Sequence, residues 1–202
     1  IKNRGMAYIM DQLELIEHDK ILFLDTDTYF HKSSLPLFDL IQPNQALFYL
    51  NEGLIYNRKR FQVYIDHLEG KTIQIDNDVY ELSKESSMWG SLMVGIMPNM
   101  RPSLDWADKL MKVFIDIVPA HTIEPFTLAE SLLRKYRMTE GKKYVSLYST
   151  SRKKEHAMPI IDEFLNKCQA LPIAKQVSLA QKVIIKRSAF KVITQRILHL
   201  LR

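Results

Sequence analysis

The chain has 202 residues, 47% of them apolar, which is enough for one domain with an appendage and excludes disordered and collagen-like classes. The single cysteine, Cys168, excludes an internal disulfide and suits a reducing compartment, and no apolar run approaches the roughly 18 residues of a membrane span. The net charge is +5, but residues 175–202 hold seven Lys and Arg and no acidic residue, whereas residues 1–174 have a net charge of −2. The basicity therefore belongs to the tail.

The first half of the chain is predicted to contain one long helix and several short strands. Residues 2–17 have apolar side chains at a spacing of three or four, which predicts an amphipathic helix. Residues 21–24 form an apolar run without alternation, typical of a parallel strand covered on both faces. The next predicted elements are a turn or short helix at 33–39, a strand at 45–50, a loop at 51–59, a strand at 72–75 and an irregular segment at 76–87.

The second half alternates strands with longer helices. Residues 88–96 (MWGSLMVGI) predict a buried strand with glycines near its edges, and residues 103–118 fit an amphipathic helix. Thr122 is predicted to cap a helix over 123–136, with Pro125 in its first turn. A strand at 144–148, a basic loop at 149–156 and helices at 159–168 and 173–201 complete the prediction. This alternation predicts an α/β fold with a mostly parallel sheet.

The segment KILFLDTDTYF, residues 20–30, places two carboxylates directly after an apolar strand. If residues 25–27 are extended, Asp25 and Asp27 point the same way, at the strand end where open α/β sheets bind ligands. Two adjacent carboxylates repel each other, and a hard divalent cation such as Mg²⁺ or Mn²⁺ would offset that repulsion. The alternative is a solvated loop in which Asp27 caps a turn. We favour the cation site because aromatic residues follow the pair.

This segment, preceded by a helix that carries Arg4, resembles the nucleotide-sugar glycosyltransferases of the GT-A type. The resemblance covers roughly residues 1–156 and includes two later stretches. SSMWGSLMVGI, residues 86–96, is similar to the strand and turn on the acceptor side of that fold. HTIEPFTLAESLL, residues 121–133, is similar to the segment in which an acidic residue opens a helix beside the acceptor. The implied fold is a GT-A-like, Rossmann-like, mostly parallel sheet flanked by helices.

The resemblance implies a metal-dependent transfer of a sugar from a nucleotide diphosphate donor. Asp27 would chelate Mn²⁺ or Mg²⁺, and Asp25 would contact the metal or the donor ribose, while the ion neutralises the leaving diphosphate. His156 is the candidate third metal ligand, although it can equally be a surface residue of a basic loop. Arg4 and Lys154 are further candidates for donor binding. Arg152 and Lys153 share with Lys154 the chemistry of a phosphate clamp.

Glu124 is the candidate acceptor-side base, since an inverting transfer needs a carboxylate to take the proton of the acceptor hydroxyl. The alternative is that its charge only suits the first turn of a helix. Asp76 and Asp78 form a second D-x-D pattern, which we interpret as loop residues. Trp89 can stack on a sugar but is more simply a core residue, and His121 is interpreted as structural.

Two domains are expected, a catalytic domain at 1–156 and a helical, basic appendage at 157–202. In GT-A proteins a strand and helix that hold the donor nucleoside precede the segment seen here, so we expect the catalytic domain to be incomplete at its N-terminus. The tail at 173–202 is basic and amphipathic, which fits an anionic membrane surface or, alternatively, packing on the domain. Nucleic acid is not expected as a partner, because no reading module is present.

The expected function is sugar transfer to a glycan or lipid-linked acceptor, as in surface polysaccharide or lipopolysaccharide synthesis, by a cytoplasmic protein peripheral to the inner membrane face. Two other functions stay open. Haloacid dehalogenase-type phosphatases also begin with an apolar strand and D-x-D, the first Asp being the nucleophile, but the position two residues after the second Asp is Tyr29 here rather than Thr or Val. A non-catalytic, truncated remnant that binds membrane or a partner is the other alternative.

Overall fold

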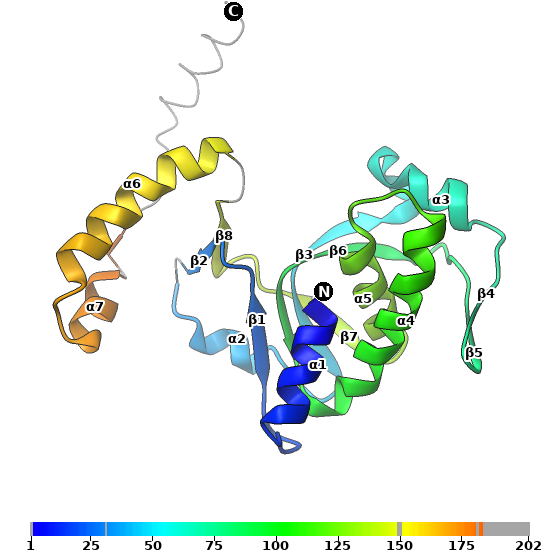
Figure 1. Ribbon diagram of the computed structural model, residues 1–202, viewed down its shortest axis with the longest axis horizontal. Coiled ribbons are helices and arrows are strands. Elements are labelled where there is room, and N and C mark those ends of the chain that lie inside the picture. Colours follow the sequence, from blue (N-terminus) through cyan, green and yellow to red (C-terminus); the bar gives the residue numbers. More distant parts are fainter. Residues whose placement is uncertain (1, 31, 149–150, 181, 184–202) are drawn as a thin grey trace, which may run out of the picture. The chain divides into compact units, whose positions relative to one another are not determined.

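A computed structural model describes residues 2–30, 32–148, 151–180 and 182–183, with the side chains of 151–153 left out (Figure 1). The chain divides into two compact units. One consists of Ile1–Thr26 and Ser33–Val145, and the other of Asp27–Lys32 and Ser146–Arg202. The predicted domain division at residue 156 stays a prediction.

The first unit contains a four-stranded mixed sheet. Its strands lie in the order β1 (Ile21–Leu24), β6 (Ser87–Ile96), β3 (Gln45–Leu54) and β7 (Arg137–Glu140). Strand β6 is antiparallel to both β1 and β3, and only β3 and β7 run parallel. The prediction of a mostly parallel sheet is therefore wrong for these strands. The apolar run of β1 indicates that side chains pack on both faces of the strand. Such packing does not determine whether the strand runs parallel or antiparallel to its neighbour.

Helices flank this sheet on both faces, so the coarser prediction of an α/β fold is confirmed (Figure 1). Helices α1 (Lys2–Gln12), α4 (Arg101–Ile117) and α5 (Ile123–Leu133) share one buried cluster with Phe48 and Val94 of the sheet. Leu47 and Met93, which directly precede Phe48 and Val94 in their strands, lie on the opposite face of the sheet and pack with Leu37 of α2 (Leu35–Asp39). This period of two is the expected geometry of a strand covered on both sides.

A close approach between layers explains one of the β6 glycines. A Cβ on Gly95 would lie 2.6 Å from Ile41 Cδ1 and 2.9 Å from Leu47 Cβ, closer than van der Waals contact allows. The residue must therefore lack a side chain for the segment after α2 to pack on β6.

A further hydrophobic cluster lies at the C-terminal end of α4 and the N-terminal end of α5. Phe114 and Phe126 stack there at 6.1 Å, beside Tyr64 of α3 (Gln62–Leu68) and Tyr80 of the hairpin β4 (Ile73–Ile75) and β5 (Asp78–Tyr80). Short 3₁₀ turns lie at Ile55–Asn57, Lys59–Phe61 and Pro98–Met100. The sequence did not predict α3, β5 or β7, since each is short and lacks a clear apolar period.

The second unit joins a small two-stranded sheet to two helices. Strand β2 (Thr28–Phe30) pairs with β8 (Val145–Leu147), which begins at the last residue of the first unit, and α6 (Ser151–Cys168) and α7 (Ile173–Ala180) follow. The prediction of a loop at 149–156 is wrong from Ser151 onward, because this polar stretch has no helix breaker before Pro159. Residues 184–202 of the predicted basic tail lie outside the described residues.

Two details of the predicted helices are corrected. Helix α1 buries Met6 and Met10, but Ile9, Leu13 and Ile16, which the helical period also placed inward, are exposed. Thr122 makes no capping hydrogen bond, and its hydroxyl instead lies 2.9 Å from the Tyr64 hydroxyl. Within the described residues, no helix combines the length and the apolar character that crossing a membrane requires.

Candidate functional site

Asp25 lies just beyond the carboxyl end of β1. Its backbone N–H donates to the Leu92 carbonyl at 2.8 Å, which continues the β1–β6 ladder by one residue. Thr26 and Asp27 then form a turn, so the extended conformation assumed for residues 25–27 is wrong. Asp27 belongs to the second unit, where its carbonyl accepts a hydrogen bond from the Tyr148 N–H at 3.0 Å.

The ammonium of Lys2 is the partner of Asp25. Lys2 Nζ lies 3.0 Å from Asp25 Oδ2, 3.1 Å from the Ser91 carbonyl and 3.3 Å from Ser91 Oγ. An ammonium has three N–H donors, and three acceptors surround this one. The ring of Phe23 adds a cation–π contact at 5.5 Å. The first turn of α1 thus brings a positive charge to the end of β1.

Glu124 contacts the same lysine from α5. Its Oε1 accepts a hydrogen bond from the backbone N–H of Lys2. Glu124 also stands in the first turn of its helix, so the helix-dipole interpretation remains open. The structure therefore brings Asp25 and Glu124, two carboxylates singled out separately in the sequence, to one residue that was not predicted to have a functional role.

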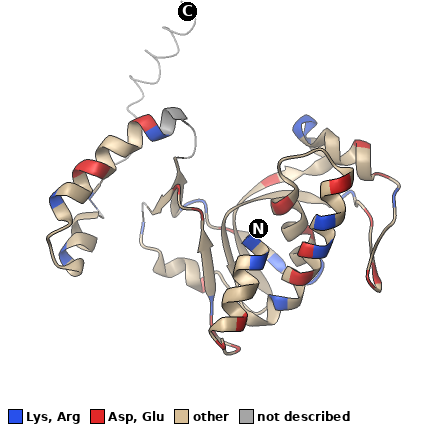
Figure 2. Cartoon of the chain, in the orientation of Figure 1, with Lys and Arg blue, Asp and Glu red and all other residues tan. Residues whose placement is uncertain are grey.

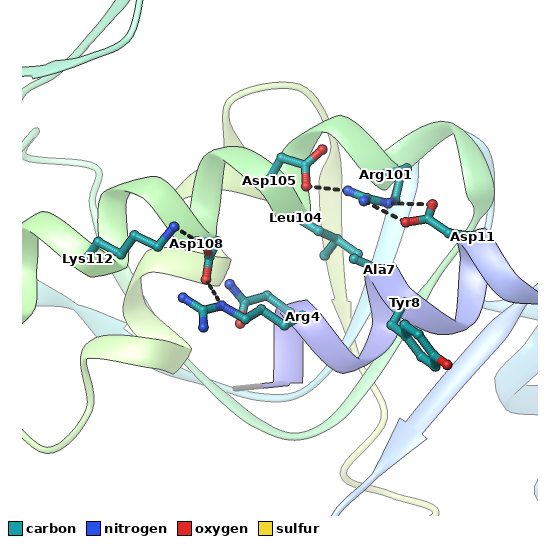
Figure 3. A pocket seen from close by; sticks show the side chains of 10 residues that line it. Arg4, Ala7, Tyr8, Asp11, Arg101, Leu104, Asp105, Asp108 and Lys112 are labelled. Carbon is teal, nitrogen blue, oxygen red and sulfur yellow. Dashed lines mark hydrogen bonds and ion pairs between the residues drawn. The ribbon is translucent and has the colours of Figure 1, made fainter.

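Arg4 has a different partner from the one predicted. Its Nε donates to Asp108 Oδ1 of α4 at 2.5 Å, and Figure 3 shows the two side chains pointing toward each other. The hydrogen bond and the charge of Asp108 raise the pKa of the Arg4 guanidinium. Arg4 is thus engaged with α4, and its role in donor binding stays a prediction.

Three further singled-out residues of this unit, Asp76, Asp78 and Trp89, have structural contacts, whereas His121, which was interpreted as structural, is exposed. Asp76 pairs with Lys109 of α4, and Asp78 Oδ2 lies 2.5 Å from Nη2 of Arg134, the residue that follows α5, so both acids of the second D-x-D form ion pairs. Trp89 is buried, donates from Nε1 to Ser87 Oγ at 2.9 Å and meets Phe48 edge to face. These contacts agree with the core interpretation of Trp89.

Lys154 and His156 lie on α6 in the second unit, where Lys154 is exposed. Nε2 of His156 is buried and finds no hydrogen-bond partner among the described residues. The side chains of Arg152 and Lys153 lie outside the described residues. Among the side chains that the structure describes, no three His, Cys, Asp or Glu residues gather as a metal site requires. The ligand set of Asp25, Asp27 and His156 stays a prediction.

Sequence reasoning missed a second carboxylate cluster around Glu130 of α5. Its Oε2 accepts hydrogen bonds from Ser86 Oγ at 2.8 Å and from the Tyr80 hydroxyl at 3.1 Å. Burial raises the pKa of the Glu130 carboxyl, and burial together with the Glu130 charge raises the pKa of Tyr80. A cavity of about 300 Å³ adjoins the cluster. The one available signal was a lone acid within the apolar stretch FTLAESLL.

Comparisons with models of known protein families, with curated proteins and with solved structures found no match. No family is shown for the chain by these comparisons. The function of the Lys2–Asp25–Glu124 site therefore has to be argued from its chemistry.

Proposed function

We propose that the chain is a GT-A-like catalytic domain that moves a sugar from a nucleotide diphosphate donor to a glycan or lipid-linked acceptor. One observation carries the proposal: Asp25, the predicted donor-side carboxylate, and Glu124, the predicted acceptor-side base, both contact Lys2. Sugar transfer needs both roles within reach of one anomeric carbon. The sequence separates the two residues by almost 100 positions, and the fold supports the pairing by placing the starts of α1 and α5 beside the end of β1.

Glu124 would act as the general base. Its carboxylate takes the proton of the acceptor hydroxyl while that oxygen bonds to the anomeric carbon, and the bond to the diphosphate breaks with its electron pair on the leaving oxygen. Lys2 would supply positive charge on the donor side, where its ammonium can exchange Ser91 for a phosphate oxygen. Asp25 would hold the ammonium in place.

The predicted Mn²⁺ or Mg²⁺ ion remains part of the proposal, with Asp25, Asp27 and His156 as its predicted ligands. Such an ion would neutralise charge on the leaving diphosphate. Lys154 and Arg4 remain proposed donor contacts. The steps assigned to Glu124 and Lys2 do not depend on that ion.

Peripheral binding to an anionic membrane is proposed for residues 173–202. Helix α7 supports this proposal in the described part of the tail, since none of its residues is buried and Ile173 and Val177 are exposed by 77% and 53%. A lipid-linked acceptor would then meet the enzyme at the membrane surface.

The experiment is a calorimetric titration of UDP, GDP, ADP and dTDP into the chain, with and without Mn²⁺. We expect one nucleotide to bind, with affinity lost in Asp25→Asn and in Asp27→Ala. Glu124→Gln should keep nucleotide binding and lose sugar transfer, because it removes only the base. Asp39→Asn, an exposed acid on α2, is the matched control and should behave as wild type.

Absence of nucleotide binding in every condition would refute the proposal. Hydrolysis of p-nitrophenyl phosphate that disappears in Asp25→Asn would instead support the phosphatase alternative, whose nucleophile would be that residue. A chain that neither binds nucleotides nor hydrolyses phosphate esters would leave the non-catalytic alternative.

A further inference from the structure

A groove of about 530 Å³ lies between α1 and α4, and its lining residues include Arg4, one of the proposed donor contacts. The two helices pack through Ala7 and Leu104 at its floor. Figure 2 shows basic and acidic residues on both helices, and Figure 3 shows their side chains along the groove. This volume lies within the range of about 300–1,000 Å³ that small-molecule sites occupy.

The charges in the groove balance and are paired with one another. Arg101 donates to Asp11 at 3.0 and 2.9 Å and also pairs with Asp105. Asp108 accepts from Arg4 at 2.5 Å and lies 3.0 Å from Lys112 Nζ. Because every cation here has a carboxylate partner, the groove offers no surplus charge to a phosphate or to a basic ligand. It does offer many hydrogen-bond donors and acceptors side by side.

One buried acceptor in this groove is unsatisfied. Asn3 is only 1% exposed and lines the groove, and its Oδ1 has no hydrogen-bond partner in the part of the chain that the structure describes. Buried polar atoms are nearly always paired, so an orphaned oxygen points to a missing donor. A hydroxyl or N–H group of a ligand in the groove would supply it.

An aromatic surface adjoins these polar groups. Tyr8 follows Ala7 on α1, lines the groove and is 65% exposed. A large exposed ring is suited to contact with an apolar ring face. The groove therefore combines an aromatic surface, an acceptor that needs a donor, and neighbouring carboxylates and guanidinium groups.

We propose that the α1–α4 groove binds a neutral saccharide. A sugar ring has an apolar face for Tyr8 and hydroxyls that both donate and accept, which suits alternating carboxylates and cations better than an ionic ligand does. One hydroxyl donates to Asn3 Oδ1, and others bond to the exposed carboxylates of Asp11 and Asp105. The inference goes beyond the proposed function, since a chain without transferase activity can bind a saccharide here. In an active transferase the groove holds part of the glycan acceptor.

The test is a titration of the chain with methyl glycosides of glucose, galactose and mannose and with their β-linked and α-linked disaccharides. Binding is followed by saturation-transfer NMR and by shifts of backbone amide signals. We expect saturable binding at millimolar concentrations, with the largest amide shifts in α1 and α4. Tyr8→Ala should weaken binding about tenfold, as expected for loss of an aromatic contact. Asn3→Ser, which shortens the acceptor, should also weaken it.

Ile115→Ala is the matched control, because Ile115 is exposed on α4 and does not line the groove. Each variant is first checked for an unchanged unfolding midpoint, and Tyr8→Ala is expected to pass since its side chain is exposed. No saturable binding of any of these sugars would overturn the inference, as would binding that Tyr8→Ala leaves unchanged. Nucleotide titration of the same samples keeps the two proposals apart, because Tyr8→Ala should not alter nucleotide affinity.

Discussion

Helix α5 contributes one carboxylate, Glu124 or Glu130, to each of two clusters, and the two clusters stabilise their carboxylates with different partners. At the start of the helix, Glu124 accepts a hydrogen bond from the backbone N–H of Lys2, and the ammonium of Lys2 forms an ion pair with Asp25. Further along, Oε2 of Glu130 accepts hydrogen bonds from the hydroxyls of Ser86 and Tyr80, and burial raises the pKa of this carboxyl. An ion pair keeps both partners charged and exchangeable for a ligand, whereas hydroxyl partners bind the carboxyl into the fold.

The comparison predicts that the two clusters along α5 have different roles. The Lys2 cluster should affect ligand binding more than stability. The Glu130 cluster should affect stability more than ligand binding, because it ties α5 to Tyr80 of the β4–β5 hairpin and to the residues that precede β6. Substitutions in each cluster can test this division.

The largest effect is expected for Glu130→Ala. The substitution removes the acceptor of two hydroxyls on residues that are each 3% exposed, Ser86 and Tyr80, and leaves both donors without that partner. Unsatisfied buried donors and the lost packing should lower the free energy of unfolding by about 2–3 kcal/mol. Urea unfolding followed by circular dichroism measures the loss. Glu85→Ala, an exposed acid beside the same cavity, is the control, and equal losses in the two variants would contradict the anchoring role.

The second prediction concerns pH. Because burial raises the pKa of Glu130 in the folded state, the folded chain binds this proton more tightly than the unfolded chain does. The stability that protonated Glu130 contributes is therefore complete below the ordinary carboxyl pKa of 4.5, which applies to the unfolded chain. It is lost as pH rises through the higher pKa of the folded state. The slope for one proton cannot exceed about 1.4 kcal/mol per pH unit.

Glu130→Gln tests this pH dependence directly. The variant keeps an oxygen for the two hydroxyls but has no proton to release, so its stability curve should be flatter than that of wild type above pH 4.5. Urea unfolding at a series of pH values measures the difference. Wild type and Glu130→Gln curves that stay parallel throughout would show that Glu130 titrates alike in both states.

The long elements of this fold could be predicted from the sequence, and the cluster at Lys2 could be predicted only in part. Strand β6 and helix α4 were predicted nearly to their ends, because β6 is an apolar run that is buried along almost its whole length and α4 buries apolar side chains at a helical spacing. Strand direction was predicted wrongly, since β1 shows burial but not orientation. Asp25 and Glu124 were found by their places at element ends. Lys2 and Glu130 were not, because their significance lies in partners brought together by tertiary packing.

The third prediction concerns the Lys2–Asp25 pair. Lys2→Met and Asp25→Asn, combined in a double-mutant cycle, should give a coupling energy of about 1 kcal/mol, because the side chains are only 20% and 31% exposed. Urea unfolding of the four proteins measures it. Lys2→Met should also weaken nucleotide binding by more than it weakens the fold. A variant that loses stability but keeps full nucleotide affinity would place Lys2 in the same structural class as Glu130.

The smallest effect on stability is expected for Arg4→Ala, although Arg4 stands only two residues from Lys2. Its guanidinium is half-exposed and pairs with Asp108, which keeps Lys112 as a second partner at 3.0 Å. Exposed ion pairs contribute little and are screened by salt, so the unfolding midpoint should move less than in Lys2→Met, and its difference from wild type should shrink further as salt is added. Asp108→Asn is the matched variant, since it removes the acid from both cations. If Arg4→Ala nevertheless abolished nucleotide binding, Arg4 would leave Asp108 to contact the donor, and the donor site would extend from the Lys2 cluster along α1.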